Sequence, residues 1–169
     1  ERLRKDFDFV FLAPGVQRSL ELKLEPTAAG LRIISGLTLL RQTALGERVN
    51  LGRRAVVIGG GNTAIDAART ALRLGVKTTV LYRRTENEMP AHPEEVREAR
   101  EEGVIFRFLA APKRLECRLD GSLERLVCEE TEPGEPDETG RPRPTPKDGS
   151  LFEIEADVIV SAIGEQADL

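Results

Sequence analysis

One glycine-rich turn between two apolar segments constrains the fold of this chain more than any other feature. Residues 54–58 form a short apolar run, which is followed at once by glycines at positions 59–61. A run with alanines at three- and four-residue spacing continues to Gly75, and a second β-branched segment covers residues 78–82. This order predicts a strand, a tight turn, an amphipathic helix and a second strand, as in the first half of a βαβ unit.

The spacing of small residues in this turn matches a phosphate-binding pattern. In the motif GxGxxG/A, here Gly59, Gly61 and Ala64, the first glycine permits the tight turn and the second lets the backbone approach a pyrophosphate. The third small residue lets helix and strand pack closely, and the N–H groups of the first helical turn favour an anion. The motif alone is weak evidence, but the strand before it and the helix and strand after it predict a dinucleotide site.

The end of the second strand distinguishes between two dinucleotides. An acidic residue about 20 positions after the glycines accepts hydrogen bonds from the ribose 2′-hydroxyl of NAD, whereas arginine accommodates the 2′-phosphate of NADP. Arg83 and Arg84 occupy this place, and the next acid is Glu86. Guanidinium groups form paired hydrogen bonds to phosphate, so the sequence favours NADP(H). The alternative is that both arginines are an ordinary solvated strand end.

The same alternation of strand and helix continues after the arginines. Pro93 is expected to open a helix over residues 94–102, which Gly103 caps. Residues 104–109 then predict a third strand, in which aromatic and charged residues alternate. A β-α-β-α-β series of this kind predicts a parallel sheet with right-handed crossovers.

The alternation of strand and helix ends in the last third of the chain. Residues 114–119 and 123–129 predict short antiparallel strands, and the proline- and glycine-rich stretch 133–150 is expected to be an exposed hairpin tip or loop. Residues 156–164 predict a final buried strand that ends on glycine. The predicted fold class is therefore α/β, a Rossmann-like parallel sheet with an inserted antiparallel β-meander.

The first fifty residues are less regular and are interpreted as a connector into the main domain. Residues 6–13 form an aromatic-rich segment that predicts a short strand. A polar alternating piece follows at 20–24, then a turn at Pro26 and a helical run over 37–45. Because the chain begins on Glu1 and its first predicted strand comes at once, we expect a fragment of a longer protein.

The composition narrows the choice of partners. Of 169 residues, 40% are hydrophobic and 32% are charged, and the net charge is −4, which argues against nucleic acid as a main partner. No apolar run approaches the roughly 18 residues that span a bilayer, and no charged-then-apolar leader is visible. We therefore expect a cytoplasmic protein without a membrane partner.

Few residues could hold a metal or act in catalysis. Cys117 and Cys128 are interpreted as core thiols on neighbouring strands or, less often, as a disulfide, and they form no CxxC pair. An iron–sulfur cluster needs four thiolates, so this chain alone cannot hold one. The single histidine, His92, precedes Pro93, where a structural or helix-capping role outweighs catalysis. We expect no catalytic residue and no metal site.

Five motifs in one order are far more specific than the glycine turn alone. They cover residues 59–64, 82–84 with 88–91, 102–104, 135–141 and 156–164. In this combination nearly the whole chain resembles the small (β) subunit family of NADPH-dependent glutamate synthase, which belongs to the FAD-dependent pyridine nucleotide oxidoreductases. The flavin modules of dihydropyrimidine dehydrogenase and of NADH-dependent ferredoxin:NADP oxidoreductase are close relatives of that family.

The resemblance implies an NADP-binding domain inserted into an FAD-binding domain. Residues 1–50 would then be the exit strand of the FAD domain and a connector, residues 51–164 the NADP-binding Rossmann domain, and residues 165–169 the start of the return. FAD and iron–sulfur clusters are expected in the parent protein, outside or at the edge of this chain. The implied partners are the FAD domain of the same polypeptide and a large catalytic subunit.

The resemblance also implies roles for individual residues. The pyrophosphate would be held by Gly59, Gly60, Gly61, Asn62, Thr63 and Ala64. Arg83 and Arg84 would bind the 2′-phosphate, and Ala162, Ile163 and Gly164 would line the nicotinamide side. Asp66 matches an acidic position near the nicotinamide ring, and the alternative for it is a helix-face salt bridge with Arg69.

The function implied is delivery of hydride from NADPH to FAD and then of electrons to iron–sulfur centres, with glutamate made from glutamine and 2-oxoglutarate in the parent complex. The same module in a ferredoxin:NADP oxidoreductase or a dihydropyrimidine dehydrogenase-like enzyme is one alternative. A non-catalytic dinucleotide-binding or sensing domain is an alternative of another class. Hydride transfer needs placement rather than a protein acid or base, which fits the lack of a catalytic constellation. Because the family's FAD pyrophosphate motif and cysteine-rich iron–sulfur segment are absent from this sequence, the chain alone is expected to bind nucleotide but to be inactive.

Overall fold

The computed structural model describes residues 2–11, 13, 15–16, 18–24, 33–138 and 140–166. A five-stranded parallel sheet with strand order β2-β9-β3-β4-β5 forms the centre of the molecule. Its strands are β2 (Ile33–Ser35), β3 (Arg54–Ile58), β4 (Lys77–Leu81), β5 (Ile105–Arg107) and β9 (Val158–Ser161). The predicted β-α-β-α-β series and the parallel sheet are confirmed, and β2 is an additional strand that the sequence did not indicate.

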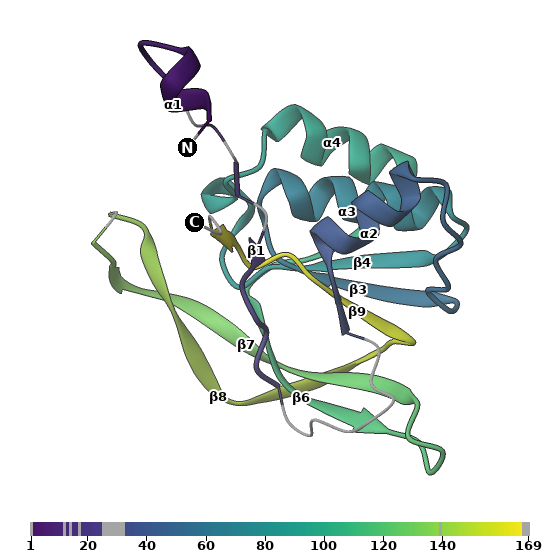
Figure 1. Cartoon of the computed structure of the whole chain (residues 1–169). Coiled ribbons are helices and arrows are strands. Elements are labelled where there is room, and N and C mark those ends of the chain that lie inside the picture. The colour runs from purple at the N-terminus through teal and green to yellow at the C-terminus, as the bar shows by residue number, and fades with distance from the viewer. Residues whose placement is uncertain are drawn as a thin grey trace.

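Three helices cover one face of this sheet (Figure 1). They are α2 (Gly36–Ala44), α3 (Asn62–Arg73) and α4 (Pro93–Glu102). The buried face of α3 consists of four alanines and Ile65, all with no exposed surface, and the small alanines let the helix lie close to the sheet. Gly103 ends α4 in a left-handed conformation with φ of 111°, as the sequence predicted.

An antiparallel sheet of three strands covers the opposite face (Figure 1). It has the order β6-β7-β8, with β6 (Ala110–Cys117), β7 (Leu123–Pro136) and β8 (Pro142–Glu155). Successive residues of the central strand face opposite cores: Val57 packs among the helices and Val56 among the meander residues. Because β3 is buried on both faces, its run is continuously apolar rather than alternating. The predicted fold class, a Rossmann-like sheet with an antiparallel meander, is confirmed.

The stretch 133–150 is mostly strand, so its prediction as a tip or loop is wrong in extent. Only residues 137–141 connect the two long strands β7 and β8. The loop was predicted from its prolines, because a proline in a central strand would remove a ladder hydrogen bond. Beyond Glu130, however, β8 is the only strand among the described residues that pairs with β7, and proline is tolerated in such a two-stranded ribbon, where Pro133 pairs with Pro144.

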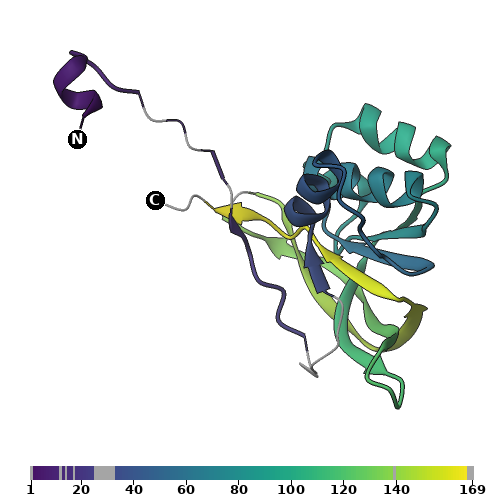
Figure 2. The ribbon, with the colours of Figure 1, turned by 45° about the vertical axis from the view of Figure 1, so that its right-hand side comes forward.

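The N-terminal segment also differs from the prediction of a strand over residues 6–13. Instead, α1 spans Leu3–Asp6, and the described residues between it and residue 18 belong to no strand. Figure 2 shows α1 extending away from the body of the molecule. Phe9 and Phe11 are 95% and 92% exposed, so nothing in the described structure supplies the ladder that a strand requires. The predicted turn at Pro26 lies outside the described residues.

A short antiparallel ribbon joins the two ends of the described chain. Its strands are β1 (Arg18–Ser19) and β10 (Glu165–Gln166), and Leu20 N donates to Gly164 O just beyond them. The predicted helical run over 37–45 corresponds to α2. Of the helices in the described part of the chain, none has both the length and the apolar character needed to cross a bilayer.

The two cysteines are free thiols, so the disulfide alternative does not hold. Cys128 on β7 lies opposite Pro112, whereas Cys117 on β6 lies opposite Leu123. Burial raises the pKa of the Cys128 thiol to about 12. Cys128 is therefore a core residue, as the first of the two interpretations had it.

Candidate nucleotide-binding site

The glycine turn lies at the carboxyl end of β3 and is closely packed on two sides. Gly59 has φ of 147°, and a Cβ there would overlap the carbonyl oxygen of Ala162. A Cβ on Gly60 would overlap the ring of Tyr82. The turn is tied to its neighbours by hydrogen bonds from Gly59 N to Leu81 O (3.1 Å) and from Ala91 N to Gly60 O (3.0 Å). Glycine is therefore a requirement of the fold at both positions.

Gly61 differs from the other two glycines because it has open space in front of it. A Cβ at this position would meet no atom within 4 Å, and the backbone has an ordinary extended conformation with φ of −90°. Gly61 is the N-cap of α3 and supplies no side chain to the N–H groups of the first turn. A cradle without side chains at a helix N-terminus is what a pyrophosphate needs.

A cleft of about 580 Å³ opens in front of this turn. It is lined by the ends of β3, β4 and β9, the start of β6, and residues 22–24. Four of its lining side chains are cationic and none is acidic among the described residues; the cations are Lys23, Arg83, Arg84 and Arg141. The cleft therefore has the charge that suits an anionic ligand.

Eight of the predicted site residues line this cleft together: Gly59, Gly60, Gly61, Arg83, Arg84, Ala162, Ile163 and Gly164. Several other lining residues had no predicted binding role: Leu22, Lys23, Leu24, residues 110–112, and Tyr82, Pro90 and Arg141, which lie within the motifs of the family resemblance. Residues 22–24 lie far from the glycine turn in sequence and belong to no motif. Arg141 ends the motif 135–141, but that motif does not indicate that its last residue reaches the cleft.

Four predicted site residues on α3 lie beside or beneath the cleft rather than on its lining. Ala64 is fully buried against the sheet. Asn62 Oδ1 accepts a hydrogen bond from His92 N at 3.0 Å, which fixes the start of α4. Thr63 Oγ1 donates to Glu165 Oε1 at 2.7 Å and so links the glycine turn to the terminal ribbon. His92 is the N-cap of α4, but its side chain makes no capping hydrogen bond.

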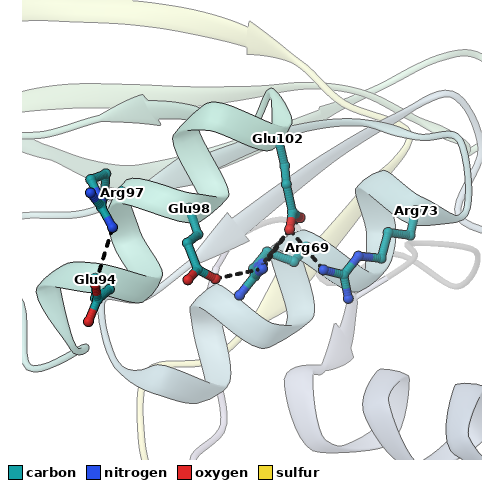
Figure 3. Close-up of polar contacts among 6 residues, drawn as sticks. All are labelled: Arg69, Arg73, Glu94, Arg97, Glu98 and Glu102. Carbon is teal, nitrogen blue, oxygen red and sulfur yellow. Dashed lines mark hydrogen bonds and ion pairs between the residues drawn. The ribbon is translucent and has the colours of Figure 1, made fainter.

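Asp66 is exposed on α3, and the alternative prediction of a salt bridge with Arg69 is wrong. Arg69 points instead toward α4, where its Nε donates to Glu102 Oε2 at 3.1 Å and its Nη2 pairs with Glu98 Oε2 at 3.0 Å (Figure 3). The hydrogen bond from Arg69, helped by Arg73, lowers the pKa of Glu102 to about 2. This network holds α3 against α4 and leaves Asp66 facing solvent.

The two arginines at the end of β4 have different environments. Arg84 is 8% exposed, and its Nη2 pairs with Asp137 Oδ2 at 2.7 Å while its Nε donates to Pro142 O at 2.8 Å. Arg83 is exposed, and its guanidinium has no hydrogen bond or ion pair within the described chain. The alternative of a solvated strand end therefore fails for Arg84, which is buried between the sheet and the hairpin tip.

The segment after the arginines is folded back on the glycine turn. A 3-10 turn, η1 (Glu86–Glu88), begins with a capping box in which Thr85 N and Oγ1 both donate to Glu88 Oε2. The Tyr82 hydroxyl donates a hydrogen bond to Glu88 O at 2.7 Å.

No cluster of His, Cys, Asp and Glu suited to a metal ion occurs among the described residues.

Comparison with known proteins adds to this geometry. The sequence matches the family described as pyridine nucleotide-disulphide oxidoreductase over residues 3–169. The NADPH-Fe(3+) oxidoreductase subunit beta of Geobacter sulfurreducens is 43% identical over 172 residues, which cover 100% of this chain and 26% of that protein. The NADP(+)-dependent formate dehydrogenase subunit beta of Moorella thermoacetica is 41% identical over 100% of this chain and 24% of its own length.

The small chain of glutamate synthase [NADPH] from Escherichia coli is 38% identical over 96% of this chain and 37% of its own length. Among solved structures, Mycobacterium tuberculosis FprA in complex with NADPH has a TM-score of 0.76 at 19% identity, over 99% of this chain and 52% of that one. A thioredoxin reductase from Lactococcus lactis has a TM-score of 0.59 at 18% identity, over 88% and 43% of the two chains. These relatives confirm the family resemblance and the fold, and the chain spans about a quarter of the length of the first two.

Proposed function

This chain belongs to the pyridine nucleotide-disulphide oxidoreductase family, and from that premise we propose that it is the NADP(H)-binding module of an FAD-dependent oxidoreductase. The observation that carries the proposal is the open cradle at Gly61, which faces a cleft with four cationic side chains and no acidic one among the described residues. A dinucleotide with an added phosphate is the anion that best suits this arrangement.

In this proposal each part of the cleft binds one part of the nucleotide. The backbone at Gly61 and the first turn of α3 hold the pyrophosphate, with Gly59, Gly60, Asn62, Thr63 and Ala64 shaping the turn. Arg83 at the rim binds the 2′-phosphate, since its guanidinium has no other partner within the described chain. Arg84 acts at the same subsite by holding the hairpin tip in place.

The other end of the cleft suits the nicotinamide. Ala162, Ile163 and Gly164 line it with small and apolar groups, so they orient a ring and exclude water without supplying a proton. When bound, the reduced nicotinamide supplies a hydride to a flavin. Asp66 lies outside the lining of the cleft, so any effect of Asp66 on the ring would be indirect.

The place of this module in a larger enzyme is also part of the proposal. We propose that the flavin lies in an FAD domain of the same polypeptide, and that electrons pass on to iron–sulfur centres and a large catalytic subunit, with glutamate synthesis as one possible end use. The ribbon of β1 and β10 is the proposed crossing between the two domains. Because β2 and α2 pack into the parallel sheet, we place the start of the NADP-binding domain at the ribbon rather than at residue 51.

Titration of the full chain with NADPH and with NADH tests the proposal. We expect NADPH to bind at least about tenfold more tightly, because a charge-assisted arginine–phosphate contact contributes roughly 1.5 kcal/mol or more. Arg83→Ala should weaken NADPH and leave NADH nearly unchanged. Arg48→Ala is a matched control, since Arg48 is also exposed but precedes β3, away from the cleft. Equal affinities for the two dinucleotides, or no binding, would overturn the proposal.

A further inference from the structure

We infer that Arg141, at the tip of the β7–β8 hairpin, is a specificity-determining residue that binds the 2′-phosphate of the dinucleotide together with Arg83. The inference rests on the proposed function and deepens it, because it adds a residue from the meander, outside the βαβ unit. Arg141 lines the same cleft as Arg83 and Arg84, and it follows β4 by more than fifty positions in the chain.

The hairpin tip is held at the cleft from both of its ends. Arg84 contacts Asp137 where the tip begins and Pro142 O where it finishes, so a single buried guanidinium closes the connection. Residue 141 is the immediate neighbour of Pro142, whose carbonyl lies 2.8 Å from Arg84 Nε. The backbone of Arg141 is therefore fixed next to the end of β4, where Arg83 also lies.

Hydrogen bonds inside the tip fix Arg141 further. Asp137 N donates to Arg141 O at 2.8 Å, and Arg141 N donates back to Asp137 Oδ1 at 3.2 Å. Gly140 N donates to Asp137 O at 2.8 Å. The two oxygens of one carboxylate thus serve different partners, because Oδ2 pairs with Arg84 and Oδ1 accepts from the Arg141 backbone. This arrangement sets the position of Arg141 before any ligand binds.

The charge at this end of the cleft supports the same assignment. The charge of Arg84 is balanced by Asp137, so Arg84 is less available to a ligand than Arg83, which is exposed. A phosphate monoester carries about −1.5 to −2 charge at neutral pH. Arg83 at the end of β4 and Arg141 at the hairpin tip both line the cleft, so two guanidinium groups can approach the phosphate oxygens from different elements.

The test compares binding of NADP⁺ and NAD⁺ by isothermal titration calorimetry on the full chain and on four variants, one of which is Arg83→Ala. Arg141→Ala should weaken NADP⁺ by roughly tenfold to a hundredfold and change NAD⁺ by less than about twofold, because only NADP⁺ carries the phosphate. The NADP⁺ affinity of Arg141→Lys should lie between those of wild type and Arg141→Ala, since lysine keeps the charge but lacks the planar guanidinium. Arg143→Ala is the matched control: Arg143 is exposed on the same hairpin and does not line the cleft.

Two results would overturn the inference while the proposed function stands. The first is that Arg141→Ala binds NADP⁺ as tightly as wild type, whereas Arg83→Ala binds NADP⁺ more weakly. The other is an equal loss for NADP⁺ and NAD⁺ in both Arg141→Ala and Arg141→Lys, which would indicate a structural role for the tip. A wild-type chain that does not distinguish the two dinucleotides would overturn the proposed function itself and this inference with it.

Discussion

The parallel layer, which is the parallel sheet with its helices α2, α3 and α4, packs against the meander of β6, β7 and β8, yet the two owe their shape to different kinds of interaction. In the β3–α3–β4 unit, close packing of small residues leaves no space: Ala64, Ala67 and Ala68 have no exposed surface, and two of the glycines have no room for a methyl group. The meander instead carries cross-strand ion pairs on its outer face, such as Arg125 with Glu153 and Lys147 with Glu130.

The difference teaches where substitutions should matter. In the parallel layer the backbone itself is in contact, so the cost of a new side chain depends on clearance measured in tenths of an ångström. In the meander the side chains that face away from the parallel sheet are solvated, and exposed ion pairs contribute little. The hairpin tip is the exception, because the ion pair between the buried Arg84 and Asp137 connects the meander to the nucleotide cleft.

The largest effect is expected for Gly59→Ala. The substitution combines a left-handed φ of 147° with an overlap between the new Cβ and the Ala162 carbonyl, so β3 or β9 must shift. We expect a loss of roughly 2–5 kcal/mol in the free energy of unfolding, measured by urea denaturation. A Gly59→Ala chain as stable as wild type would show that the parallel layer is looser than its packing indicates.

Gly61→Ala is the matched control for that substitution and separates stability from binding. Its φ of −90° suits alanine, and the new Cβ would meet nothing within 4 Å. The free energy of unfolding should therefore stay within about 0.5 kcal/mol of wild type. Nucleotide affinity should still fall, because the methyl group occupies the space where the pyrophosphate approaches the backbone.

The same contrast explains which parts of the fold could be predicted from the sequence. The strands and helices around the glycine turn follow from local signals: glycine spacing, alanine periodicity, Pro93 at a helix start and Gly103 at its end. The long strands of the hairpin did not follow, because proline was weighed without knowing that β7 beyond Glu130 has a single neighbouring strand. β2 was missed because three residues are too few to show a period.

The site was predictable in position but not in the roles of its side chains. Spacing from the glycines placed both arginines at the cleft, which is where they lie. Their separation into a buried and an exposed residue depends on Asp137, which is 53 positions from Arg84 in sequence. The pairing of Arg69 with α4 rather than with Asp66 likewise depends on how two helices pack, which i,i+3 spacing does not reveal.

A smaller loss is expected for Arg84→Ala, which removes the buried pair at the hairpin tip. Asp137 and Pro142 O would lose a charged donor, so the free energy of unfolding should fall by about 1.5–3 kcal/mol. Arg84→Lys should not restore the stability, because one ammonium group cannot contact both Asp137 and Pro142 O as the guanidinium does. Hydrogen exchange at the Arg141 N–H would report whether the tip opens.

Arg83→Ala is the control for the buried arginine, since it removes the same side chain one residue earlier. Arg83 is exposed, so its loss should change the free energy of unfolding by no more than about 0.5 kcal/mol. An equal loss in the free energy of unfolding for Arg83→Ala and Arg84→Ala would contradict the distinction between Arg84 as a positioning residue and Arg83 as a ligand-binding residue.

The smallest effect is expected for Glu102→Gln, which weakens the exposed network between α3 and α4 (Figure 3). The pKa of Glu102 falls from its ordinary 4.5 to about 2 in the folded chain, so its charge stabilises the fold fully above about pH 4.5. That contribution is lost progressively as the pH falls from 4.5 toward 2. At pH 7 we expect Tm to fall by roughly 1–3 °C, and we expect the difference in Tm between the variant and wild type to narrow below pH 4.5.

Glu94→Gln removes the separate Arg97 pair on the same helix and is the control. A gap that stays constant down to pH 3 would mean that Glu102 acts through packing rather than charge, which would extend the close-packed character of the parallel layer to its outer surface.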